Sequence, residues 1–215
     1  MKSQISVLKN SLSGDLLDGK FDNGRYSTDA SIYQIMPEAV ILPKNIEDIK
    51  KTIQFSQEHN IPILPRGGGT SQNGQTVNRA IVLDNSKYLN KIIEVDAINQ
   101  TCLVEPGVVL DELNRFLKPY GLWFPVDVST SSRATIGGMA GNNSAGGRSI
   151  RYGIMRDNVM SIDALLSDAS EAHFGLSKDD ISGLKSLFPK LMAIAEKNKN
   201  EIKTRFPKVL RRVGG

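Results

Sequence analysis

The chain has 215 residues, of which 40% are hydrophobic, and this is enough for one or two globular domains with a buried core. No apolar run approaches the ~18 residues that a membrane helix requires, and the N-terminus is too polar for a signal peptide. The single cysteine, Cys102, excludes an internal disulfide framework and a thiolate-rich metal site. We therefore expect a cytoplasmic protein without a metal site or a membrane span, and leave open peripheral association with the inner face of the membrane.

The formal net charge of +4 is unevenly distributed. Residues 178–215 hold ten Lys and Arg against four Asp and Glu, which gives +6 there and −2 over the preceding 177 residues. Basic segments can bind nucleic acid or membrane surfaces. Here the basic residues are spaced along a predicted amphipathic helix, so we favour a solvated helix face and expect no nucleic-acid partner.

In chain order, the first predicted elements are a short helix and a polar loop, which together form a lead-in over residues 1–36. A strand follows at 39–42, and then a helix that Asn45 caps and that runs to about His59. A second strand is predicted at 61–64. Isoleucines at i, i+3 and i+7 should form the buried face of the helix: Ile46, Ile49 and Ile53.

Further strands are predicted at 80–84, 92–96 and 101–105, before a helix marked by Leu110, Leu113 and Leu117. A strand at 159–166 and a hairpin turn lead into another strand at 171–174. Four apolar residues then indicate a final amphipathic helix: Ile181, Leu184, Leu191 and Ile194. We divide the chain into a lead-in, two subdomains and a helical segment with the bounds 1–36, 37–106, 107–177 and 178–215.

Two glycine-dense stretches, 66–75 and 135–153, span 29 residues but hold ten of the 19 glycines. Glycine allows left-handed turns and close approach of the backbone to a bulky group. Exposed backbone amides also form a natural cradle for phosphate oxygens. Two such cradles predict one long phosphorylated cofactor held between two lobes.

Two common phosphate loops do not fit the first stretch. The Rossmann pattern, started at Gly67, requires glycine at position 72, where the chain has Gln72. The P-loop pattern requires a lysine where the chain has Gln75, and a helix where strand residues follow. Both assignments are rejected.

What remains resembles a specific family. Pro65–Ser71, PRGGGTS, looks like the pyrophosphate loop of FAD-linked oxidases with the vanillyl-alcohol oxidase / p-cresol methylhydroxylase (PCMH-type) fold. Residues 129–147 are similar to the second flavin-contacting segment of that family, within a resemblance that covers 26–215. The D-2-hydroxy-acid dehydrogenase branch is the most similar one. The resemblance implies an α+β fold, with two α/β subdomains, FAD between them and the substrate cap domain absent.

The resemblance also implies how FAD would be held. Backbone amides from Arg66 to Ser71 would wrap the pyrophosphate, with the Arg66 charge near the phosphates or the flavin edge. Thr70 stands where relatives with covalent flavin often carry histidine, so noncovalent FAD is expected. The residues assigned to cofactor binding are Pro65, Arg66, Gly67, Gly68, Gly69, Thr70, Ser71, Gln75, Pro125, Ser129, Ser132, Thr135, Gly137, Gly138, Asn142, Asn143, Ser144, Tyr152 and Gly153.

Structural roles compete with some of these assignments. Residues 67–69 could be an ordinary turn, and Asn142 and Asn143 could be turn formers. Other polar and aromatic residues are given structural roles in the first instance: His59, His173, Cys102, Asp111 and Glu112, and Trp123, Phe124 and Pro125 at the lobe interface.

By resemblance, the reaction is oxidation of a D-2-hydroxy acid by hydride transfer to flavin N5. The catalytic residues are unknown and are expected in a cap domain, so this chain alone should bind FAD but turn over little substrate. An electron-acceptor protein or an iron–sulfur domain is a further expected partner. The alternatives are an NADPH-dependent enolpyruvyl-sugar reductase of the same fold and a non-catalytic FAD-binding half-domain.

Overall fold

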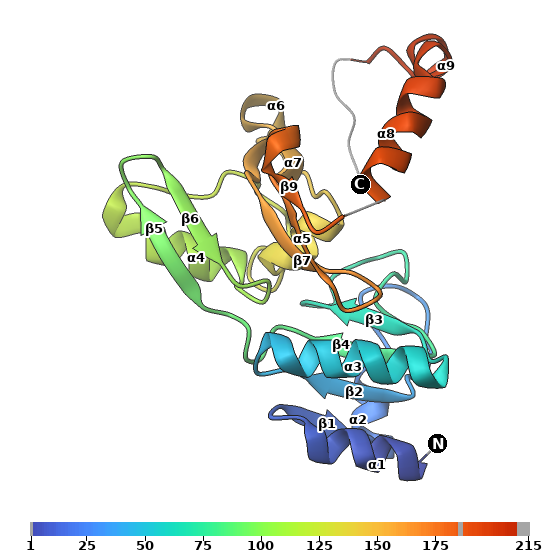
Figure 1. The fold of residues 1–215 in the computed structure, drawn as a ribbon. Coiled ribbons are helices and arrows are strands. Elements are labelled where there is room, and N and C mark those ends of the chain that lie inside the picture. Colours follow the sequence, from blue (N-terminus) through green and yellow to red (C-terminus); the bar gives the residue numbers. More distant parts are fainter. Residues whose placement is uncertain (1, 185–186, 210–215) are drawn as a thin grey trace.

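The computed structural model describes residues 2–184 and 187–209 (Figure 1). These residues form a four-stranded sheet of order β1-β2-β4-β3, a two-stranded ribbon β5-β6 and a three-stranded sheet β7-β8-β9. The elements of the first part have these bounds: α1 (Lys2–Ser11), β1 (Asp15–Leu17), α2 (Lys20–Arg25), β2 (Ala39–Leu42), α3 (Ile46–His59), β3 (Ile63–Arg66) and β4 (Ile81–Asp84).

The four-stranded sheet is mostly parallel and is buried on both faces. β2 and β3 both pair with β4 in parallel, and β1 adds an antiparallel edge beside β2. On one face α1 and α3 supply Ile5, Leu8 and Phe55 to a core that includes Ile41 and Ile81. The opposite face buries Val40, Leu42 and Val82 under aromatic and aliphatic side chains. Continuous apolar strands such as AVIL and IVLD are what burial on both faces requires.

The remaining elements are β5 (Ile92–Asp96), β6 (Thr101–Val104), α4 (Leu110–Leu117), the 3₁₀ turn Lys118–Tyr120, α5 (Ile136–Gly141), α6 (Ser149–Tyr152), α7 (Met155–Asn158), β7 (Ile162–Leu165), β8 (Glu171–Phe174), the 3₁₀ turn Lys178–Asp180, β9 (Ile181–Ser182), α8 (Leu187–Lys197) and α9 (Lys199–Arg205). In Figure 1 the β5-β6 ribbon lies beside α4, while α8 and α9 extend away from the sheets. In the part of the chain that the structure describes, no helix is both long and apolar enough to cross a bilayer.

Most predicted elements are confirmed. The predicted strands at 39–42, 92–96 and 171–174 match β2, β5 and β8, and Leu110–Leu117 forms α4 with all three marker leucines buried. The strand predicted at 61–64 lies two residues later, at Ile63–Arg66, because Ile61 still closes the turn that ends α3.

The capped helix α3 is confirmed with one correction. The Asn45 side chain accepts a hydrogen bond from the Asp48 backbone amide at 2.9 Å, as expected of an N-cap. Ile53 is buried and Ile49 is partly buried, but Ile46 is 57% exposed. The prediction for Ile46 was therefore wrong, since the first turn points this position into solvent while Asp48 faces inward.

The prediction of one final helix from Ile181 to Ile194 was wrong. Ile181 lies in β9 and pairs with Phe174 of β8, so strand pairing overrides the helical spacing of the apolar residues. The helix α8 begins at Leu187, and its Leu191 and Ile194 are 50% and 59% exposed instead of buried. Residues 185–186 and 210–215 of the predicted helical segment lie outside the described residues.

Two segments contain helices or strands that the sequence analysis did not predict. The polar lead-in holds β1 and α2, and β1 completes the edge of the first sheet. The second glycine stretch contains α5 and α6, and α7 follows directly after it, although glycine disfavours helices. Thr135 caps α5, since its hydroxyl accepts a hydrogen bond from the Gly138 amide at 3.3 Å.

The subdomain boundaries stay a prediction. The β5-β6 ribbon packs across the predicted boundary at 106, because Ile92, Val95 and Val104 contact the core formed by Leu113 and Leu117 of α4. The β7-β8 hairpin lies against α3 through an ion pair between the Lys50 Nζ and Glu171 Oε1 atoms at 2.6 Å. Both contacts join parts of the chain far apart in sequence.

A buried carboxylate ties the N-terminal segment to the first sheet. Asp48 is fully buried, and its two oxygens accept hydrogen bonds from the amides of Ser13, Gly14 and Lys44 at 2.8, 3.0 and 2.9 Å. A carboxylate satisfied by three N–H donors is stable in the interior, but removing it leaves those donors unpaired.

We predict that Asp48→Ala lowers the free energy of unfolding by about 2–4 kcal/mol, because three backbone donors lose the buried carboxylate that accepts from them. Glu47→Ala is the matched control, since Glu47 is exposed in the same helical turn. Urea unfolding of both variants measures the difference. Equal losses in the two variants would contradict the role given to Asp48.

His173 joins the three strands of the last sheet. Its Nδ1 lies 2.6 Å from Asp163 Oδ1 on β7, and its Nε2 lies 3.3 Å from Asp180 Oδ1 just before β9. The hydrogen bond to Asp163, reinforced by the charges of Asp163 and Asp180, raises the pKa of His173 above the ordinary value of 6.5. The folded state therefore binds the proton more tightly than the unfolded chain does.

The stabilisation by His173 should be complete at low pH and lost as the pH rises through the raised pKa. We predict that wild type melts above His173→Gln at about pH 6, and that this gap narrows by about pH 8.5. Thermal melting of both proteins at the two pH values measures it. A difference in melting temperature that widens with pH would exclude stabilisation by protonated His173.

Candidate functional site

The first glycine stretch lies at the carboxyl edge of the parallel strands. Arg66 ends β3 and is paired in register with Asp84, which ends β4. In open parallel sheets, ligands bind in the crevice outside the carboxyl ends of the strands. A hollow of about 380 Å³ opens at this edge, lined by Arg25, Tyr26, Arg66, Gly67, Gly68, Asp84 and Ser86.

Arg66 anchors both ends of the glycine loop. Its guanidinium donates hydrogen bonds to the carbonyl oxygens of Tyr26, Thr28 and Thr76 at 3.3, 2.9 and 3.0 Å. The amide of Ala30 donates to the Gly69 carbonyl at 3.1 Å. The loop is therefore tied to the segment 26–30 before any ligand arrives.

The amides of this loop are available to a ligand. Within residues 2–184 and 187–209, none of the five successive backbone N–H groups from Gly67 to Ser71 donates a hydrogen bond to the protein. Gly69 has a φ of +65°, a conformation in which glycine is favoured. Successive free N–H groups next to a cationic side chain are a typical binding site for phosphate oxygens.

The two glycine-dense stretches touch each other. A Cβ atom on Gly67 would lie 2.1 Å from the Thr135 hydroxyl oxygen, and one on Gly68 would lie 2.2 Å from the Arg133 carbonyl oxygen. No side chain larger than hydrogen fits at either position without displacement of Thr135 or of Arg133, which directly precedes the second stretch. The two predicted cradles therefore meet at one edge.

The hollow is lined by a buried acid, Asp84, which was not predicted as a site residue. The Tyr26 hydroxyl donates to Asp84 Oδ2 at 2.6 Å, and the amide and hydroxyl of Ser86 donate to Asp84 Oδ1. Burial and the hydrogen bond to Asp84 hold the pKa of Tyr26 far above its usual value. The hollow is lined by four residues that were not predicted, next to Gly67 and Gly68: Arg25, Tyr26, Asp84 and Ser86. Of these four, only Asp84 carried a signal in the sequence, because it lies at the end of a predicted strand.

The backbone amides at the start of the second stretch donate hydrogen bonds within the protein. The N–H groups of Ile136 and Gly137 donate to the carbonyls of Val108 and Pro106 at 2.8 and 2.9 Å, and Gly138 donates to Thr135. A Cβ on Gly137 would meet Pro106 at 2.5 Å. The amides of Ile136, Gly137 and Gly138 are therefore engaged within the protein, and packing of the 135–138 backbone against a cofactor stays a prediction.

The predicted polar residues of the second stretch form hydrogen bonds within the protein. Asn142 donates to the Ser144 hydroxyl at 3.2 Å, and the Asn143 side chain accepts from the Arg156 amide at 3.1 Å. Asn143 has a φ of +45°, as the turn-forming alternative requires. Their assignment to the cofactor stays a prediction.

Other predicted residues are dispersed. Pro65, Gln75, Ser129 and Ser132 are exposed, and Pro125 is partly buried. No hydroxyl hydrogen bond of Thr70 or Ser71 occurs among the described residues. Tyr152 lies beside Trp123, in a different hollow from the one at Gly67, and Gly153 is buried with a φ of +85°.

Comparison with known families agrees with this geometry. The sequence profile of the FAD binding domain family matches residues 37–175, which include both glycine stretches and more than half of the chain. The chain therefore belongs to this FAD-binding domain family, and the predicted family is confirmed.

Curated relatives place the chain nearer to one group of oxidoreductases. D-2-hydroxyglutarate dehydrogenase of Escherichia coli (strain K12) is 40% identical over 156 residues, which are 71% of this chain and 15% of that protein. Glycolate oxidase subunit GlcD of Bacillus subtilis (strain 168) is 39% identical over 159 residues, 72% of this chain and 34% of that protein. The chain thus spans about a sixth to a third of the length of these relatives.

Solved structures confirm the fold. Alkyldihydroxyacetonephosphate synthase superposes with a TM-score of 0.71 at 23% identity, over 82% of this chain and 38% of that chain. 6-Hydroxy-D-nicotine oxidase from Arthrobacter nicotinovorans gives a TM-score of 0.67 at 20% identity, over 76% and 36%. The mixed α/β architecture of PCMH-type FAD-binding domains was therefore predicted correctly.

The contact between the two stretches gives a direct test. We predict that Gly68→Ala lowers the free energy of unfolding by about 1–3 kcal/mol, since its Cβ overlaps a backbone carbonyl. It should also weaken FAD binding by about tenfold or more, because the free amides are displaced.

Gly141→Ala is the control, because the space around a Cβ at Gly141 is open and the residue lies in a helix. It should leave FAD binding unchanged and should not lower the free energy of unfolding, since alanine is favoured over glycine in a helix. Urea unfolding and flavin fluorescence titration measure the two effects. Unchanged FAD affinity in Gly68→Ala would show that this loop does not bind the cofactor.

Proposed function

We propose that this chain binds FAD noncovalently and is the cofactor-binding part of an enzyme that oxidises a D-2-hydroxy acid. The observation that carries the proposal is the row of five free N–H groups from Gly67 to Ser71, beside the Arg25 and Arg66 side chains, at the carboxyl edge of a parallel sheet.

The residues of this edge fit a pyrophosphate. Glycine at 67 and 68 keeps the backbone bare, and the N–H groups supply donors without desolvating a side chain. Arg25 pairs with Asp22 at 3.5 Å, but the Arg25 side chain is exposed and that of Asp22 partly so, so this ion pair is weak and leaves the guanidinium able to turn to a phosphate. Two cations offset the negative charge of Asp84 in the same hollow.

The noncovalent attachment follows from the residue types in the loop. The positions from Gly67 to Ser71 offer no histidine, and the two histidines of the chain end α3 and lie on β8. A threonine at position 70 can donate a hydrogen bond to a phosphate but does not form the bond to flavin that a histidine forms. We therefore expect denaturation to release the cofactor intact.

When bound, FAD supplies the acceptor for the two electrons and the hydrogen removed from the substrate carbon. The contribution of this chain is to hold the phosphates at 67–71 and to pack the Thr135–Gly138 backbone against the rest of the cofactor. We assign no proton-transferring base to the chain. The D-2-hydroxy acid class rests on the names of the relatives, D-2-hydroxyglutarate dehydrogenase and glycolate oxidase subunit GlcD. An electron-acceptor protein or iron–sulfur domain belongs to the same proposal.

We predict that the purified chain is yellow, with absorbance near ~450 nm, and that denaturation releases FAD into the supernatant. Added FAD at about a hundredfold excess over its Kd should stabilise the apoprotein by about 2.7 kcal/mol, which raises the melting temperature by about 5–10 °C. Absorbance spectra and thermal melts measure both effects. The loaded chain should oxidise little D-lactate, glycolate or D-2-hydroxyglutarate.

Three outcomes would contradict parts of the proposal. A colourless chain whose melting temperature does not respond to FAD would refute cofactor binding. Anaerobic NADPH that bleaches the bound flavin rapidly would instead favour the reductase alternative. Steady oxidation of a hydroxy acid by the loaded chain would show that the catalytic base lies within these residues.

A further inference from the structure

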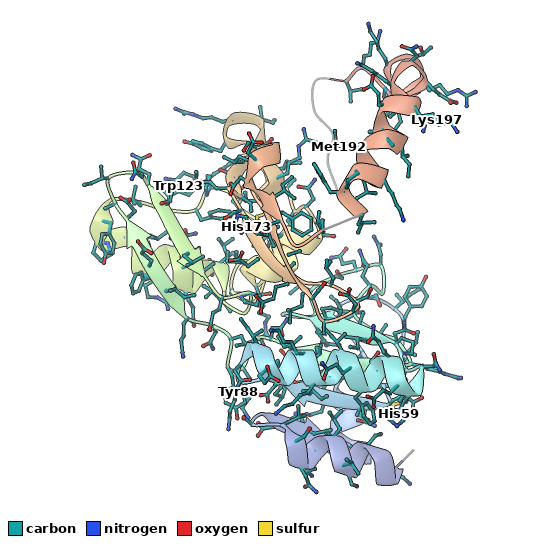
Figure 2. All side chains as sticks on the ribbon, viewed as in Figure 1. His59, Tyr88, Trp123, His173, Met192 and Lys197 are labelled. Atoms are coloured by element: carbon teal, nitrogen blue, oxygen red, sulfur yellow. The ribbon has the colours of Figure 1, made fainter. Side chains whose placement is uncertain are left out.

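A second hollow, of about 310 Å³, lies in the later part of the chain, away from the glycine loop. Its lining comes from the turn around α6 and from Trp123 in the segment after α4: Trp123, Gly147, Arg148, Ile150, Arg151 and Tyr152. Figure 2 shows Trp123 in the upper part of the molecule, far from His59 at the end of α3. The volume is at the lower end of the range for small-ligand sites, roughly 300–1,000 Å³.

Two arginines are held in place by aromatic rings. The Arg148 guanidinium lies 5.1 Å from the centroid of the Trp123 ring, and that of Arg151 lies 5.3 Å from the centroid of the Tyr152 ring. The two rings meet edge to face, with centroids 5.2 Å apart and planes at 86°. Stacking of this kind orients a guanidinium group. Its N–H groups lie in the plane of the guanidinium and can still donate hydrogen bonds to a ligand.

The positive charge of this hollow is only partly neutralised. Asp127 accepts a hydrogen bond from the Arg148 amide at 2.9 Å, but its carboxylate lies 3.7 Å from the Arg148 Nε. With 62% of the Arg148 side chain exposed, that ion pair contributes little. Arg151 has no acidic side chain within 4.0 Å among the described residues. Two like charges three residues apart on one helical turn repel, and a bound anion would relieve this repulsion.

We propose that this hollow binds a small dicarboxylate, with one carboxylate on Arg148, the other on Arg151, and the carbon chain against the edges of Trp123 and Tyr152. Guanidinium forks match carboxylates bidentately. The aromatic walls favour a ligand with a carbon skeleton over inorganic phosphate, which has no apolar surface to bury. This ligand is separate from the FAD phosphates proposed at Gly67–Ser71, so the site does not depend on the proposed cofactor.

Trp123 is the only tryptophan of the chain, so its fluorescence reports on this hollow alone. We expect glutarate, added to the FAD-free chain, to change that fluorescence saturably. Arg151→Gln should raise the Kd by about tenfold or more, because a charge-assisted bidentate contact is lost. Arg115→Gln is the matched control: Arg115 is an exposed arginine on α4, outside the hollow, and its loss should leave the Kd unchanged.

Calorimetry measures glutarate binding to the FAD-loaded chain. Glutarate should bind to that chain with the same affinity as to the FAD-free chain. Tryptophan fluorescence that does not saturate would overturn the proposal, as would equal losses in the two arginine variants. Inorganic phosphate or pentanoate binding as tightly as glutarate would exclude a site for two carboxylates. Loss of glutarate binding in the FAD-loaded chain would assign the hollow to the flavin. Failure of the chain to bind FAD would refute only the proposed function, since the fluorescence titration uses the FAD-free protein.

Discussion

The close approach of two backbones is the constraint on which the cofactor site depends. Gly67 and Gly68 lie so near Thr135 and Arg133 that a single added carbon would overlap an oxygen atom. The first loop is thereby fixed against Thr135 and Arg133, and Arg66 fixes it against the segment before β2 through the carbonyls of Tyr26 and Thr28. With the loop held on both sides, its free N–H groups stay at the carboxyl edge of the sheet. A cradle organised before binding loses less conformational entropy when a ligand enters.

The two glycine stretches have different physical tasks. The first leaves its amides free, whereas the second uses its amides at 136–138 to dock on Pro106 and Val108 and to start α5. Glycine in the second stretch serves close packing, as the contact of Gly137 with Pro106 shows. A high glycine content in both stretches therefore does not imply the same function, and we assign the phosphate-binding role to the first loop.

The sequence was sufficient where local signals agree with the tertiary structure. Apolar runs such as 39–42, the Asn45 cap and the leucines of α4 each form the predicted element, and the PRGGGTS motif led to the right family. It was insufficient where distant residues decide. Ile181 joins a strand because Phe174 lies beside it. Tyr26 reaches the site through a hydrogen bond to Asp84 that spans 58 residues, and Arg25 lines the same hollow next to it. The contact of Gly67 with Thr135 likewise has no local signature.

Backbone amide NMR of the ¹⁵N-labelled chain during FAD titration tests the central claim most directly. If the N–H groups from Gly67 to Ser71 bind the pyrophosphate, their resonances should show the largest shifts, downfield as expected for new hydrogen bonds to phosphate oxygens. Amides of the second stretch that are already paired, such as those of Gly137 and Met139, should move less. Large shifts at 136–139 with unmoved signals at 67–71 would contradict the account.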